Sequence, residues 1–352
     1  GAQAGTLLRQ EAFVHGVPTN AQAWRILYTT TRPDGSAALA SAIVMASRTA
    51  DGGPRPVIAW THGTTGISAG CAPSLLGDPF ANVPALSKLI DKGWLYVATD
   101  YVGQGTPGPH PYLIGEGEAR SALDAIRAAR QMETIQAGED TVVWGHSQGG
   151  HAALWSGIVA PDYAPEIKLL GIAAVAPASD LRPMLKSLHA KPIGRIMSSF
   201  VLHSYAAAYP DISPDAYVSG WKSWLASDIA GRCLAERSAL FSVAEALLAG
   251  GSLFTQTPTD GPFGERLEQN TPNQLLPQPL LIAQGLADDL VQPDIQNQFV
   301  KARCEAGQEL EYRTYAGHDH LSIVALDSPL SQDLVQWTND RINRVPFTNQ
   351  CL

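Results

Sequence analysis

The pentapeptide at 145–149, which reads Gly-His-Ser-Gln-Gly, constrains the fold of this chain more than any other feature of its sequence. It follows a short apolar run, Thr141–Trp144, and it leads into a helix-forming stretch, Gly149–Val159. A G-x-S-x-G sequence in that setting is typical of a sharp strand-to-helix turn that projects a serine hydroxyl from the edge of a sheet. Glycine lacks the Cβ atom that would clash with neighbouring elements at the two flanking positions. The helix that follows points the positive end of its dipole at the serine hydroxyl. We therefore predict that Ser147 is a nucleophile.

Strand-like and helix-like stretches alternate along most of the chain after residue 50. The runs that we predict as buried parallel strands are Val57–Thr61, Leu95–Thr99, Thr141–Trp144, Gly171–Val175, Leu280–Ala283 and Leu310–Tyr315. The stretches that we predict as helices are Glu118–Met132, Gly149–Val159, Asp294–Ala306 and Ser331–Asn343. Such alternation indicates a mostly parallel central sheet with helices on both faces. Combined with the serine turn, it predicts the α/β-hydrolase fold.

The first part of the chain differs from this alternation. The segments Ala23–Thr30 and Leu39–Ala46 have the character of strands, and the turn sequence Arg-Pro-Asp-Gly at 32–35 lies between them. We predict that they pair as an antiparallel hairpin before the parallel sheet begins.

The interval 178–278, hereafter the cap segment, also breaks the alternation. A structureless loop of that length is improbable in a compact domain. The segment carries large apolar side chains, which include Trp221, Trp224, Leu247 and Leu248. We predict that residues 1–177 and 279–352 form the α/β core, and that the cap segment forms an inserted helical cap or lid over the sheet.

A serine nucleophile needs a base, and the base needs a carboxylate to orient it. In this fold the acid follows the serine along the chain and stands at the end of a strand. Asp288 follows the strand Leu280–Ala283 and has the spacing G-x-x-D-x-x-V, with Gly285 and Val291 on either side. The adjacent Asp289 is the alternative. We favour Asp288 as the acid.

The base should follow the last predicted strand, Leu310–Tyr315. Two histidines lie there, His318 and His320. An apolar stretch begins after His320 and favours a helix, which is where this fold places its base. His318 lies in the preceding turn, as a surface residue or as a donor to the site. We favour His320.

The oxyanion of a tetrahedral intermediate needs amide donors. One donor should be the N–H of Gln148, because it directly follows the nucleophile. The loop after the strand Val57–Thr61 reads His-Gly-Thr-Thr-Gly at 62–66 and should supply the other. We predict that this second donor is the amide of Thr64, with Thr65 as the alternative.

Composition and motifs exclude several other classes of function. The net charge is −9, from 24 Lys+Arg and 33 Asp+Glu, and no basic stripe is present, so we expect no nucleic-acid partner. No apolar run reaches the ~18–20 residues of a membrane span, so no stable membrane anchor is expected. Dinucleotide-binding and phosphate-loop motifs are absent, and no histidine pair has metal-ligand spacing on a helix. We expect a small-molecule substrate, no cofactor and no metal.

The four cysteines are Cys71, Cys233, Cys304 and Cys351, and no two of them form a C-x-x-C pair. Two disulfides would use all four and would imply an oxidising compartment. Four buried free thiols in a cytosolic protein are the alternative. The spacing alone leaves both interpretations open.

Several short motifs together resemble the secretory lipase family of the α/β-hydrolase superfamily. They are His62–Gly66, Cys71–Ser74, Asp100–Gly103, His110–Tyr112, Gly145–Gly150 and Gly285–Asp289. The serine pentapeptide is common to many hydrolases, whereas the Cys-Ala-Pro-Ser sequence at 71–74 is more specific. The resemblance covers most of the chain from near residue 20 and is weakest across the cap segment.

This resemblance implies a catalytic triad of Ser147, Asp288 and His320. It also implies two disulfides, Cys71–Cys233 and Cys304–Cys351, and therefore a secreted or periplasmic protein. Each disulfide would contribute ~2–4 kcal/mol to stability. Members of the family act on carboxylic esters, and the cap forms the wall that binds the acyl group. The chain is thus expected to be a serine carboxylesterase or triacylglycerol lipase-like enzyme of lipid degradation.

The expected reaction is ester hydrolysis through an acyl-enzyme intermediate. An acyltransferase or an amide hydrolase could use the same three residues. A hydrolase-like binding protein without activity is a more remote alternative, because serine, acid and histidine are all present in the expected order. We expect a monomer that makes at most transient contact with a lipid interface.

Overall fold

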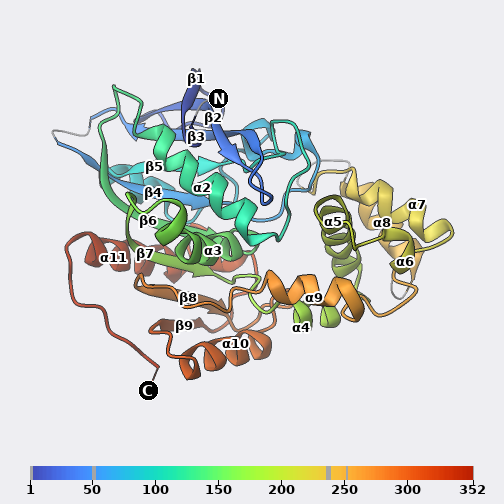
Figure 1. The fold of residues 1–352 in the computed structure, drawn as a ribbon. Coiled ribbons are helices and arrows are strands. Elements are labelled where there is room, and N and C mark those ends of the chain that lie inside the picture. Colours follow the sequence, from blue (N-terminus) through green and yellow to red (C-terminus); the bar gives the residue numbers. More distant parts are fainter. Residues whose placement is uncertain (1–2, 50–52, 235–238, 251–252, 352) are drawn as a thin grey trace.

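The architecture is that of a twisted sheet with helices on both faces and a helical segment at one end (Figure 1). The computed structural model describes residues 3–49, 53–234, 239–250 and 253–351. Within these residues the sheet has nine strands in the order β1-β2-β3-β5-β4-β6-β7-β8-β9. The strands are β1 (Leu7–Phe13), β2 (Ala21–Thr31), β3 (Ala37–Ser47), β4 (Arg55–Thr61), β5 (Leu95–Thr99), β6 (Ala137–His146), β7 (Lys168–Val175), β8 (Leu280–Gly285) and β9 (Glu311–Tyr315).

The strands from β4 onward are parallel to one another, whereas β1, β2 and β3 form an antiparallel meander that joins the sheet through β5. The predicted hairpin and the predicted mostly parallel sheet are both confirmed. Because parallel strands place their carboxyl ends at one edge, the residues that follow β4, β6, β8 and β9 are brought together there. That edge carries the candidate site.

Helices cover both faces of the sheet. Leu154 of α3 and Phe299 of α10 are buried in a cluster on one face, together with apolar residues of α2. Leu89 of α1 and Trp337 of α11 are buried in the cluster on the other face. These helices are α1 (Leu86–Asp91), α2 (Gly115–Ala129), α3 (Gln148–Tyr163), α10 (Pro293–Glu305) and α11 (Pro329–Ile342), and the short 3-10 helices are η1 (Ala69–Cys71), η2 (Pro73–Leu75) and η3 (Ser322–Val324). No helix in the described part of the chain is long and apolar enough to cross a membrane.

Helices also form the cap segment, which connects β7 to β8. They are α4 (Leu181–Leu188), α5 (Pro192–Ala208), α6 (Pro214–Tyr217), α7 (Trp221–Ala230), α8 (Ala239–Ala249) and α9 (Gly261–Gln269). Figure 1 shows α5 to α8 gathered beside one end of the sheet. Together with α9 they surround an apolar cluster that also includes Tyr112, Leu113 and Val291 of the core. In this cluster Phe200, Tyr205 and Phe263 are fully buried. Trp221 and Trp224, two of the side chains that led us to expect a folded segment, are instead 56% and 67% exposed.

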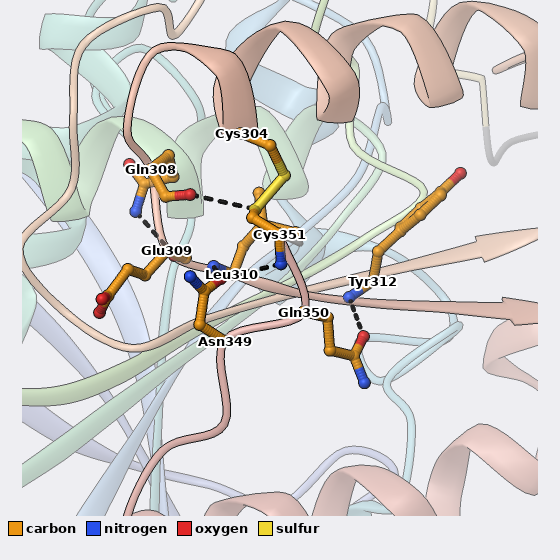
Figure 2. Close-up of a disulfide and its surroundings, with 8 residues drawn as sticks. All are labelled: Cys304, Gln308, Glu309, Leu310, Tyr312, Asn349, Gln350 and Cys351. Carbon is orange, nitrogen blue, oxygen red and sulfur yellow. Dashed lines mark hydrogen bonds between the residues drawn. A yellow bond between two sulfur atoms is a disulfide. The ribbon is translucent and has the colours of Figure 1, made fainter.

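Two disulfides tie distant parts of the chain together, Cys71–Cys233 and Cys304–Cys351. The second one fastens the C-terminal tail to α10, as Figure 2 shows. Beside it, the tail follows the edge strand β9: the side chain of Gln350 accepts a hydrogen bond from the amide of Tyr312 at 2.9 Å, and the amide of Gln350 donates to the carbonyl of Leu310 at 2.8 Å. The tail thus occupies part of an edge that would otherwise expose unpaired backbone groups.

Candidate active site

Ser147 occupies a strained turn between β6 and α3. Its backbone has φ 60° and ψ −118°, which is a costly conformation for a residue other than glycine and is typical of functional sites. A Cβ atom at Gly145 would overlap the carbonyl oxygen of Gly149, and one at Gly149 would overlap the carbonyl oxygen of Thr61. Both flanking positions therefore require glycine, as the sequence predicted. The serine side chain is held at the start of α3, at the positive end of that helix.

A chain of hydrogen bonds runs from Ser147 through His320 to Asp288. The Nε2 atom of His320 lies 2.8 Å from the hydroxyl oxygen of Ser147, and its Nδ1 atom lies 2.7 Å from Oδ2 of Asp288. Because an ionised carboxylate can only accept, Nδ1–H donates to Asp288 and Nε2 is left to accept the serine proton. The side chain of Asp288 is fully buried, whereas that of His320 is 12% exposed. This is the geometry of a nucleophile, a base and an orienting acid.

Backbone amides fix the position of Asp288. Its Oδ1 atom accepts hydrogen bonds from the amides of Leu290 at 2.8 Å and Val291 at 2.9 Å. Its neighbour Asp289 is exposed and lines the cavity mouth without joining these contacts in the described part of the structure. The G-x-x-D-x-x-V spacing thus corresponds to a turn in which Val291 helps to hold the acid.

The two candidate histidines have different surroundings. His320 lies in the turn after β9 and points to the serine, whereas the ring of His318 lies 3.5 Å from the hydroxyl of Ser322. The helix predicted in the apolar stretch after His320 is only the short 3-10 helix η3 (Ser322–Val324). That turn buries Ile323 and Val324, and the chain then reaches the proline that opens α11.

The loop at 62–66 lies directly against the nucleophile. A Cβ atom on Gly63 would come 3.6 Å from the Cβ of Ser147 and 3.2 Å from the carbonyl oxygen of His146. The next residue, Thr64, lines the cavity, and its hydroxyl lies 2.7 Å from the hydroxyl of Tyr112. Gln148 is the first residue of α3, so its N–H has no acceptor within the helix. The two predicted oxyanion donors therefore border the serine from the β4 loop and from α3.

The side chain of Thr65 points elsewhere. Its hydroxyl accepts a hydrogen bond from the side chain of Gln104 at 3.0 Å, and its carbonyl accepts from the amide of Leu234 in the cap segment at 2.8 Å. The loop is thus anchored on both sides, which favours a fixed backbone at Thr64.

A cavity of about 480 Å³ opens at the serine, a volume within the usual range for small-molecule sites. The core contributes apolar side chains on one side, among them Ile43, Trp60, Tyr96 and Ala98. The cap segment contributes Lys191, Ile193, Met197 and Leu234. The wall is mostly apolar, and its polar residues include Ser147 and His320. Among the described residues, no group of three or more His, Cys, Asp and Glu side chains is placed to hold a metal ion.

Comparison with known proteins gives the family. The model of the secretory lipase family matches residues 81–350. This chain belongs to the secretory lipase family. The resemblance inferred from the short motifs is confirmed.

Individual relatives of this secretory lipase family member are distant in sequence. A probable inactive lipase of Mycobacterium tuberculosis is 24% identical over 99% of this chain and 80% of its own length. Lipase 4 of Candida albicans is 24% identical over 95% of this chain and 76% of its own length. The structure of Candida antarctica lipase A in its closed state matches with a TM-score of 0.78 at 19% identity, over 99% of this chain and 84% of that one. The α/β-hydrolase fold is thereby confirmed.

A second histidine supports the site in this family member. The Nε2–H of His146 donates to the carbonyl of His320 at 2.7 Å, and the two rings lie 4.8 Å apart at 34°. Burial, together with the nearby charge of protonated His320, lowers the pKa of His146 to about 3. His146 is therefore neutral and holds the loop of the base.

Asp100 is a further polar residue of the cavity wall. Its carboxylate accepts hydrogen bonds from the hydroxyl of Ser41 at 2.7 Å and from the hydroxyl of Ser74 at 2.5 Å. Burial raises the pKa of this carboxyl, whereas the hydrogen bonds from Ser74 and Ser41 act in the opposite direction. Asp100 thus anchors the segment around η2, which contributes Pro73 and Leu76 to the cavity wall.

Proposed function

We propose that this chain is a carboxylic ester hydrolase that works through Ser147, His320 and Asp288. The observation that carries the proposal is the chain of hydrogen bonds, 2.8 Å and 2.7 Å long, at the mouth of a largely apolar cavity. Membership of the secretory lipase family supports the same reaction class. Hydroxyl, imidazole and carboxylate in this arrangement suit acyl transfer.

In the proposed mechanism, Ser147 attacks the ester carbonyl while His320 takes its proton. Asp288 holds the imidazole in the reactive tautomer and stabilises its charged form. The amides of Thr64 and Gln148 donate to the oxyanion that forms on the carbonyl oxygen. His320 then protonates the leaving alcohol. Water attacks the acyl-enzyme in the second step, again with His320 as the base, and the acid product leaves.

The cavity supports an ester with an apolar acyl or alcohol part as the substrate. Trp60 and Tyr96 border it on the sheet side, whereas Ile193 and Met197 border it on the side of the cap segment. We propose that the cap segment sets the range of chain lengths, because it contributes wall but no member of the proposed triad. A preference for short or medium chains would class the enzyme as an esterase rather than a lipase.

We propose that the protein works outside the cytoplasm, either secreted or in the periplasm. Both disulfides need an oxidising compartment to persist, and the family is named for secretion. A monomer suffices for the proposed reaction, because one chain supplies every residue of the proposed mechanism.

A direct assay of hydrolysis is needed, because one relative is named a probable inactive lipase. Turnover of p-nitrophenyl butyrate should be abolished by Ser147→Ala, while the thermal unfolding temperature stays close to that of the wild type. Ser36→Ala is the matched control, because Ser36 is exposed in the turn between β2 and β3. An inactive wild type, or an active Ser147→Ala variant, would contradict the proposal.

Two further measurements refine the function. A series of p-nitrophenyl esters from acetate to palmitate gives the chain-length preference. Adding an alcohol to the assay shows how the acyl-enzyme partitions between water and the alcohol. Ester hydrolysis predicts mainly free acid, whereas mainly transesterified product would identify an acyltransferase.

A further inference from the structure

A buried pair of ionisable residues lies behind the nucleophile turn and takes no part in the proposed reaction. Glu118 belongs to α2 and His151 to α3, and both side chains are 0% exposed. The Nδ1 atom of His151 lies 2.9 Å from Oε2 of Glu118. Burying two ionisable groups away from water costs free energy unless each of their polar atoms has a hydrogen-bond partner. The partners of this pair therefore indicate its role.

The partners of His151 determine how its protons are arranged. Its Nε2 atom lies 2.7 Å from the backbone carbonyl oxygen of Asn270, which can only accept, so Nε2 carries a hydrogen. A single further proton is then held between Nδ1 and Glu118 Oε2. The pair is electrically neutral as a whole whichever atom carries that proton.

The other carboxylate oxygen of Glu118 reaches the residue next to the nucleophile. Its Oε1 atom accepts from the side-chain amide of Gln148 at 3.0 Å and from the backbone amide of Leu113 at 2.9 Å. The same amide nitrogen of Gln148 lies 3.1 Å from Nε2 of His110. The Nδ1–H of His110 already donates to the carbonyl of Val102 at 3.0 Å, so its Nε2 accepts.

Both N–H groups of the Gln148 side chain are therefore committed, one to Glu118 and one to His110. Burial lowers the pKa of His110 to about 3, so that ring stays neutral and remains an acceptor. The carbonyl oxygen of the same Gln148 side chain is buried and has no hydrogen-bond partner among the described residues. The orientation of Gln148 is thus set by the two acceptors rather than by its own carbonyl.

The pair also reaches the cap segment. The carbonyl of Asn270, which accepts from His151, also accepts from the indole N–H of Trp155 at 2.8 Å. The side chain of Asn270 donates to the hydroxyl of Tyr209 on the cap side at 2.9 Å and accepts from the amide of Gly115 at 3.0 Å. The pair thus lies between the nucleophile turn and the C-terminal end of the cap segment.

We propose that Glu118, braced by His151, is a positioning residue that fixes Gln148 and thereby the backbone amide at the start of α3 that would hold the oxyanion. This inference rests on the proposed function, since it concerns the same transition state. Displacement of a donor by about 1 Å can cost on the order of 100-fold in rate. Loss of the Glu118 acceptor should therefore lower kcat and leave KM almost unchanged.

The test is a set of variants assayed for kcat and KM on p-nitrophenyl butyrate. Glu118→Met removes the acceptor at similar size and should lower kcat by ~10- to 100-fold, with KM within about twofold of wild type. Glu118→Gln can complete the same hydrogen bonds and should restore most of the rate. Glu116→Gln is the matched control, because Glu116 is an exposed residue of the same helix.

A double-mutant cycle with Gln148→Ala gives the decisive readout. Gln148→Ala should itself lower kcat, and adding Glu118→Met should lower it no further, because the glutamate acts through the glutamine. Three results would overturn the inference. The losses of kcat in the two single variants could multiply in the double variant, the effect of Glu118→Met could fall on KM, or Gln148→Ala could have a normal kcat. Gln148→Ala also keeps the test decisive if Glu118→Met does not fold.

Failure of the proposed function would look different. A wild type that turns over no ester would overturn both the proposed function and this inference. If the wild type turns over ester but the losses of kcat in Glu118→Met and Gln148→Ala multiply in the double variant, only the inference about Glu118 is overturned.

Discussion

The α/β core and the cap segment use the same kinds of residues in opposite ways, and their tryptophans show this most clearly. In the core, Trp144 is fully buried and its indole N–H donates to the hydroxyl of Thr338 at 2.8 Å. In the cap segment, Trp221 and Trp224 are 56% and 67% exposed. Trp144 of the core is thus constrained by packing and hydrogen bonding together, whereas Trp221 and Trp224 are largely exposed, although other large side chains of the cap segment, such as Phe200 and Phe263, are fully buried.

The two regions also contribute differently to the site. The core carries all three residues of the proposed triad and the proposed oxyanion loop, which follow β4, β6, β8 and β9. The cap segment supplies cavity wall, such as Ile193 and Met197, and it is anchored through Cys233 and Asn270. We propose that the core determines the reaction and that the cap segment determines which esters reach it. The predictions below test that division.

The largest expected effect is on the base. His320→Ala should lower kcat by about 10⁴-fold or more, since the proton of Ser147 would have no acceptor. His318→Ala should change kcat by less than about threefold, because its ring contacts Ser322 and not the serine of the site. Steady-state kinetics on p-nitrophenyl butyrate measure both. Equal losses in the two variants would contradict the assignment.

The second-largest expected effect is that of replacing the proposed acid, Asp288. Asp288→Asn removes the charge that orients Nδ1–H of His320 and should lower kcat by about 10³- to 10⁴-fold with little loss of fold. Asp289→Asn is the control, because that side chain is exposed at the cavity mouth. It should act mainly on KM. A dominant effect of Asp289→Asn on kcat would move the acid to the neighbouring position.

Removing the disulfide between the two regions should have a smaller effect on kcat. It should lower both stability and the binding of substrate. Cys71→Ser combined with Cys233→Ser opens a loop of 162 residues and should lower the free energy of unfolding by about 2 to 5 kcal/mol. The adjacent Leu234 lines the cavity and its amide donates to Thr65, so KM should rise more than kcat falls. Denaturant unfolding and kinetics together check this, and a loss confined to kcat would contradict it.

The smallest predicted effect concerns pH. Burial lowers the pKa of His146 to about 3, well below its value in the unfolded chain, so its contribution to stability is complete at neutral pH and is lost as the pH falls. Relative to His146→Phe, the wild type should lose about 2 kcal/mol between about pH 7 and about pH 5. Denaturant unfolding at several pH values measures this difference. A difference that does not change with pH would contradict a buried, neutral His146.

Local rules predicted the parts of the molecule in which one short segment decides its own conformation. Gly145 and Gly149 identified the nucleophile turn, because only glycine fits on either side of Ser147 there. The parallel strands were recognisable as buried apolar runs, and β5 has the predicted bounds, Leu95–Thr99. Each of these features leaves a recognisable pattern in a short stretch of sequence, even where the atom that excludes a Cβ belongs to a distant residue, as Thr61 does at Gly149.

Features that depend on distant partners were not predictable in this way. The edge strand β1 (Leu7–Phe13) was missed because most of its side chains are exposed and no apolar alternation marks it. The position of β5 between β3 and β4 follows from pairing across the sheet and not from any local pattern. Glu118 is the first residue of the helix predicted at Glu118–Met132 and lies in the first turn of α2, and only the fold brings it to His151. The sequence offered no signal for this contact, because an acidic residue at the start of a helix is common on helix-dipole grounds alone.

Covalent labelling tests the central claim most directly. A fluorophosphonate probe reacts with an activated serine and not with an ordinary one, so peptide mass spectrometry of the labelled protein locates the nucleophile. We predict a single adduct on Ser147, and its loss when His320 is replaced by alanine. An unlabelled protein, or an adduct on another serine with Ser147 unmodified, would contradict the account.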